Sequence, residues 1–176
     1  MTDQDVFSIG FTEVLYGVVV ANAIYELTFA VELRNVLLLL AFAFIVGDWV
    51  EYQFSIEQGV ETPWKYFKTL VLDITILVVW YFLTIISVDR IEWFFAVSAA
   101  FFFLQYLWDI FVLGDMRMRT EEYAEIELAV TFATLAALAM AEALPVVWLV
   151  VLAGILFFTR KIPVWEFYLT QASSPG

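Results

Sequence analysis

The chain contains no cysteine and no histidine. The missing cysteine excludes disulfides, thiolate metal sites, iron–sulfur clusters and thiol nucleophiles. The missing histidine excludes imidazole ligands to haem, zinc or iron, and it excludes Ser–His–Asp hydrolysis. Basic residues are scarce as well, since 8 Lys and Arg face 20 Asp and Glu, for a net charge of −12. We therefore expect no enzyme, no cofactor, no bound metal and no nucleic-acid partner, because nucleic acid requires a basic patch.

Apolar side chains are abundant instead. Of the 176 residues, 64% are hydrophobic and 16% are charged, against about 45–50% and about 25% in ordinary soluble domains. A chain of this length has too little interior to hide so much apolar surface, so part of it must face lipid. The composition predicts a multi-pass protein of the cell membrane. Its excess of carboxylates is typical of proteins from halophilic (salt-loving) organisms.

Apolar runs of about 20 residues are needed to cross a bilayer as helices. We expect an all-α, polytopic membrane protein, a single domain over 1–176 built as a bundle of six transmembrane helices. The predicted spans are about 7–29, 33–54, 67–87, 91–113, 122–144 and 145–159, followed by a short cytoplasmic tail, 160–176. Thr62-Pro63 is typical of a helix start, and Asp89 with Glu92 is typical of a reciprocal N-cap.

The basic residues predict the orientation. Six of the eight lie between spans two and three, between spans four and five, or after span six; only Arg34 and Arg90 fall on the other side. By the positive-inside rule, both termini are cytoplasmic.

Predicted spans contain the acidic residues Glu13, Glu26, Asp48, Asp73 and Asp109. Ionisable groups at this depth are costly and need an explanation. The lysines, 65, 68 and 161, sit at the ends of apolar runs, so we expect no basic residue deep enough to pair with the central carboxyls. Those carboxyls must then be protonated, hydrogen-bonded to neutral donors, or open to a hydrated path. The alternative to a hydrated path is a purely structural role, in which neutral carboxyls hold neighbouring helices together by hydrogen bonds.

The first predicted span is polar on two faces. At 100° per residue, Glu13 shares a face with Gly17, while Val18, Asn22 and Tyr25 lie nearly opposite, with Glu26 beside them. Such a helix cannot present either face to lipid, so we expect it to be central. One face would pack against its own subunit and the other would line a pore or cleft.

These residues resemble a known pattern. Phe11-Thr12-Glu13, Glu26-Leu27, Ala41-Phe42, Trp49 and Glu51-Tyr52-Gln53 occupy the places of motifs in the first two helices of the endolysosomal potassium channel family (transmembrane protein 175) and its prokaryotic relatives. The resemblance implies six helices with cytoplasmic termini and a homo-oligomer around the first helices. Phe7 stands where the family has Arg, and the family's histidine pair is absent.

The resemblance also assigns roles to residues. Val18, Asn22 and Tyr25 fall at the family's apolar constriction, and two of the three are polar, which implies an ungated, weakly selective or non-potassium path. Glu26 would concentrate cations at one mouth. Phe11, Thr12, Glu13 and Trp49 would be structural. The start of the first span also resembles low-temperature-requirement-A-type membrane proteins, which implies no sharper mechanism.

Three functions follow as hypotheses. The first is a small oligomeric cation channel, with potassium as a candidate ion, whose first helices line the path of monovalent cations. The second is a proton- or cation-coupled carrier that uses Glu13, Asp48, Asp73 and Asp109 as a relay, although the spans show no inverted repeat or broken helix. The third is a structural membrane subunit or scaffold.

Overall fold

The computed structural model describes residues 14, 17–21, 24–25, 32–56, 63–85, 89–113 and 119–172. These residues are helical or lie in short connections, and within the described ranges no strand occurs, so the all-α prediction is confirmed. The six helices of this part of the chain are α2 (Leu33–Ile56), α3 (Pro63–Ile85), α4 (Ile91–Trp108), the π-helix η2 (Asp109–Leu113), α5 (Arg119–Met140) and α6 (Val146–Ala172). Residues 14, 17–21 and 24–25 of the first predicted span are also helical.

Four of the helices are long and apolar enough to cross a membrane. Their apolar spans are Leu33–Tyr52, Ile91–Phe111, Tyr123–Met140 and Val146–Glu166, and α3 contributes a shorter apolar stretch, Thr69–Ile85. These four candidate spans indicate a multi-pass membrane protein that contacts the lipid bilayer. The count of six spans stays a prediction.

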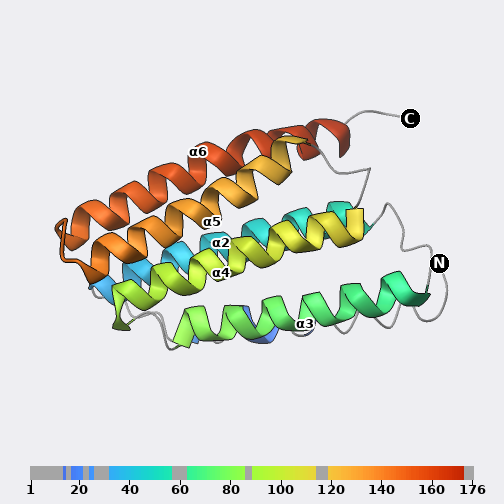
Figure 1. Cartoon of the computed structure of the whole chain (residues 1–176). Helices are drawn as coiled ribbons and strands as arrows, with labels where there is room; N and C mark the ends of the chain where they lie inside the picture. Colours follow the sequence, from blue (N-terminus) through green and yellow to red (C-terminus); the bar gives the residue numbers. More distant parts are fainter. Residues whose placement is uncertain are drawn as a thin grey trace.

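The long helices run roughly parallel or antiparallel to one another (Figure 1). α4 packs against α3 and α5, α5 packs against α6, and α2 contacts α3 and α6. One end of the bundle therefore collects the C-terminal ends of α2, α4 and α6 and the N-terminal ends of α3 and α5, on the right in Figure 1. We call this the loop end.

Interlocked phenyl rings fill the middle of the bundle. We call Phe44, Phe94, Phe95, Phe102, Phe132 and Phe157 the phenyl cluster; all are buried. Phe44 is central, with ring centroids 4.5 Å from Phe157, 5.3 Å from Phe102 and 5.4 Å from Phe132. Tilted and edge-on pairs at these separations are the favourable aromatic geometries. The cluster joins α2, α4, α5 and α6 into one aromatic core.

Two helix ends differ in detail from what the sequence favours. Arg90, rather than Asp89, is the N-cap residue of α4, with extended backbone and no side-chain cap bond. Asp89 instead pairs with Arg34 at 3.4 Å, and Glu92 pairs with Arg90 at 2.6 Å. At the C-terminal end of α5, Glu142 has φ 51°, and the N–H groups of Glu142 and Ala143 bond to the carbonyls of Ala139 and Leu138, which closes the helix in a Schellman turn.

The last helix is longer than the predicted span. The expected span ended at 159 with a tail from 160, but α6 continues to Ala172 and contains Pro163. Proline lacks an N–H and disrupts the helical hydrogen-bond ladder. Directly after α4, residues Asp109–Leu113 form the π-helix η2, a form often found at functional sites. Both irregularities lie toward the loop end.

Candidate functional site

A lysine is buried in the bundle beside two glutamates. The side chain of Lys161 on α6 is 2% exposed, and its ammonium lies 2.7 Å from Oε2 and 3.0 Å from Oε1 of Glu51 on α2. It also pairs with Oε1 of Glu125 on α5, whose side chain is 3% exposed. Trp165, one turn further along α6, donates its indole N–H to Glu51 Oε1 at 2.9 Å. We call these four residues the Lys161 cluster.

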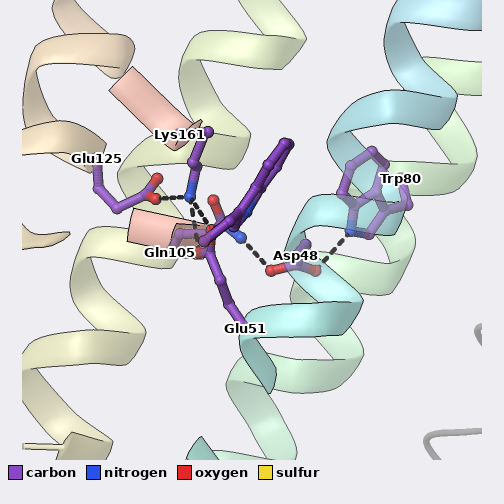
Figure 2. A network of polar contacts seen from close by, with 7 residues as sticks. Asp48, Glu51, Trp80, Gln105, Glu125 and Lys161 are labelled. Atoms are coloured by element: carbon purple, nitrogen blue, oxygen red, sulfur yellow. Dashed lines mark hydrogen bonds and ion pairs between the residues drawn. The ribbon is translucent and has the colours of Figure 1, made fainter. Parts of the chain in front are cut away.

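Asp48 forms a second group one turn before Glu51 on α2. Its carboxylate accepts a hydrogen bond from the Trp80 indole of α3 at 3.2 Å and another from the Gln105 amide of α4. Figure 2 shows both groups as one network, with Glu125 and Lys161 at one side, Asp48 and Trp80 at the other, and Gln105 between them. The network thus contains residues from all five long helices.

Asp73 on α3 is held in the same manner. The Trp108 indole donates to its Oδ1 at 2.8 Å, and the Tyr52 hydroxyl donates to its Oδ2 at 3.4 Å. Asp48 and Asp73 are therefore buried carboxyls that accept hydrogen bonds from neutral donors, one of the alternatives that the sequence left open. Asp109, by contrast, is half-buried at the start of η2.

Carboxyl groups outnumber basic groups in the Lys161 cluster. Two glutamates meet one lysine, and Asp48 lies in the adjoining group. Two buried oxygens of the network, Glu125 Oε2 and Gln105 Oε1, accept no hydrogen bond from the residues that the structure describes. Buried polar atoms are nearly always satisfied. The arrangement is therefore suited to bind a further proton or another small cation.

The residues of the first predicted span are largely outside the description. Phe11, Thr12, Glu13, Asn22 and Glu26 lie outside the described residues. Val18 and Tyr25 are described, and both are exposed, at 61% and 86%. Trp49 on α2 is also exposed rather than packed in the core.

The centre of this network was not predicted from the sequence. The expectation from apolar run lengths was different. It placed Lys161 at the end of a span, too shallow to pair with the central carboxyls, whereas α6 continues past it and Lys161 is fully buried. Glu125 and Gln105 were not singled out at all. The sequence does contain a sign of the buried ion pair. Two pairs of like-charged residues, Glu125 with Glu127 on α5 and Arg160 with Lys161 on α6, have members that point to different sides of their helices, so one member of each pair can face the bundle.

Comparison with protein-family models, with curated proteins and with solved structures finds no match to this chain.

Proposed function

We propose that the protein transports cations, protons foremost, across the cell membrane, as a coupled carrier whose proton-binding group is the Glu51–Lys161–Glu125 triad. The single observation that carries this proposal is the imbalance of ionisable groups in the triad: the buried carboxyl of Glu125 and the partly buried carboxyl of Glu51 share one buried ammonium. Intramembrane ionisable groups are costly and mark ion pathways and proton relays more often than structural joints. Neutral side chains would join α2, α5 and α6 at lower cost.

The position of the triad supports transport through rearrangement rather than through an open pore. Glu51, Glu125 and Lys161 all lie in the loop-end half of the bundle, because they come late in α2 and α6 and early in α5. The phenyl cluster begins at Phe44, less than two turns before Glu51, and fills the middle of the bundle. A proton or cation bound at the triad thus has an aromatic barrier on one side.

Two irregular helical segments flank the triad. The π-helix η2 follows Gln105 and Trp108 on α4, and Pro163 lies two residues after Lys161 on α6. Such interruptions weaken the helical hydrogen-bond ladder locally. They are the segments at which α4 and α6 would bend when the site exchanges between the two sides of the membrane.

The test is proton flux into liposomes that contain a pH-sensitive dye, measured under proton, sodium and potassium gradients. Glu125→Gln should abolish flux, since it removes the titrating oxygen and keeps the shape of the side chain. Glu127→Gln is the matched control, because Glu127 lies on the same helix and is 46% exposed; it should conduct as wild type. If wild type shows no flux under any gradient and Glu125→Gln only weakens the fold, the network is a scaffold.

The cation channel is a second candidate, and the exposure of Val18 and Tyr25 favours it. Side chains that face the axis of a homo-oligomer must lie outside the packing of their own subunit, as these two do. Asn22→Leu would then create an apolar collar that gates by dewetting. In the channel, this change should sharply reduce liposome flux while the detergent oligomer stays intact. In the carrier, Asn22→Leu should leave flux unchanged and Glu125→Gln should abolish it.

A further inference from the structure

A groove of about 300 Å³ lies between α5 and α6, apart from the buried network. Its apolar lining includes Ile126, Val130 and Leu156, and its polar lining includes Glu127, Thr131 and Arg160. Arg160 and Glu127 form an ion pair of 2.8 Å, and both side chains are about half-exposed, at 51% and 46%. The groove is therefore an open, mostly apolar strip with one charged pair.

The helices that form the groove place it in the bilayer. Both α5 and α6 contain candidate membrane spans, Tyr123–Met140 and Val146–Glu166. Val130, midway along the α5 span, is 60% exposed. Because the apolar strip follows two membrane-spanning helices and is open on the outside, the molecule that contacts it in a membrane is a lipid chain.

The charged pair lies within reach of lipid headgroups. Arg160 comes six residues before the end of its apolar span at Glu166, which places its Cα about 9 Å from that end at 1.5 Å per residue. A long basic side chain reaches the interface from such a depth by snorkelling. Its guanidinium carries five N–H donors in a fork that matches phosphate, more than the contact with Glu127 uses.

Charge complementarity selects the kind of lipid. The chain has a net charge of −12, so most of its polar surface repels anionic headgroups. Arg160 is an exception on the membrane-facing side, next to an apolar strip that accepts an acyl chain. We propose that the α5–α6 groove binds an anionic phospholipid, with the lipid phosphate on Arg160 and one acyl chain along Ile126, Val130 and Leu156.

The test is a lipid titration of the detergent-solubilised full chain, read by native mass spectrometry and by the shift in Tm. Phosphatidylglycerol should bind and raise the Tm more than phosphatidylcholine with the same acyl chains. Arg160→Gln should lower the affinity for phosphatidylglycerol about tenfold, as expected when one charge-assisted contact is lost. Arg90→Gln is the matched control, since Arg90 forms a similar pair with Glu92 at 2.6 Å in a different part of the chain; its affinity should equal that of wild type.

A second variant tests the acyl chain separately from the headgroup. Val130→Trp should fill the strip and lower the affinity for both lipids, while Arg160 stays in place. Equal binding of the two lipids by wild type, equal losses in Arg160→Gln and Arg90→Gln, or full binding by Val130→Trp would each overturn the proposal. Soluble glycerol phosphate should not raise the Tm; if it reproduces the whole shift, the groove is an anion site and not a lipid site. None of these outcomes depends on transport by the Lys161 cluster.

Discussion

Lys161 Nζ lies 2.7 Å from Glu51 Oε2, although the two residues are 110 positions apart in the chain and the lysine side chain is 2% exposed. The contact joins the last helix of the chain to α2, and Glu125 adds α5 to the same ammonium. Arg160 of α6 and Glu127 of α5 form a second ion pair, on the outer side of these two helices. The α5–α6 hairpin thus has one ion pair on its inner side and another on its outer side.

The two pairs should differ strongly in their effect on stability. Lys161→Met would leave the buried Glu125 and the partly buried Glu51 without their cation, at a cost of about 3–5 kcal/mol in the free energy of unfolding. Arg160→Met breaks a half-exposed pair and should cost about 0–1 kcal/mol. Equilibrium unfolding of both variants in mixed micelles measures the difference. Equal losses would mean that Lys161 is solvated rather than buried.

The indole N–H of Trp108 should stabilise the fold through its hydrogen bond to Asp73. Trp108→Phe keeps an aromatic ring but removes the N–H that Asp73 Oδ1 accepts at 2.8 Å. Leaving a buried acceptor short of a donor costs about 1–3 kcal/mol. Trp148→Phe is the control, since Trp148 is exposed on α6, and it should change the Tm little. A Trp108→Phe protein as stable as wild type would contradict the hydrogen bond.

Even a methyl side chain at Gly47 should lower the stability of the fold. A Cβ at this position would lie 2.7 Å from Cζ2 of Trp165, whose ring is held by its bond to Glu51. Gly47→Ala must therefore displace the indole and should cost about 1–3 kcal/mol, the range for overpacking. At Gly154 a Cβ meets nothing within 4 Å, so Gly154→Ala should be neutral or stabilise by up to about 1 kcal/mol through helix propensity. Thermal unfolding of the two variants distinguishes these effects.

Much of the fold could be predicted from apolar run lengths, because a helix that crosses a bilayer needs a stretch of fixed length. The stretches predicted at 33–54 and 91–113 correspond to α2 and to α4 with η2. Asp48 and Asp73 could be predicted as buried because apolar residues surround them in sequence. These predictions use only local sequence.

The Lys161 cluster could not be predicted in this way. A charged residue at the edge of an apolar run normally marks the membrane interface, and Arg160-Lys161-Ile162-Pro163 adds a proline that usually ends a helix. In the structure the helix continues through Pro163, so Lys161 stays inside the bundle beside Glu51 and Glu125. Burial of the lysine depends on two partners 110 and 36 residues away, and no local pattern reports such partners.

The distribution of basic residues predicts the side of the membrane that the triad faces. Lys and Arg gather in the connections at the loop end, so this end and both termini should be cytoplasmic. A reporter fused after Gly176 should therefore be cytoplasmic, and one inserted at Arg90, between α3 and α4, should be external.

Because Glu51, Glu125 and Lys161 lie in the loop-end half, this topology makes the triad accessible first to cytoplasmic protons. In inside-out vesicles, a carboxyl-modifying reagent added outside should then block flux, whereas right-side-out vesicles should resist it. An external C-terminus with a cytoplasmic Arg90 insertion would reverse the expected side of access, whereas both reporters on the same side would remove the six-helix count.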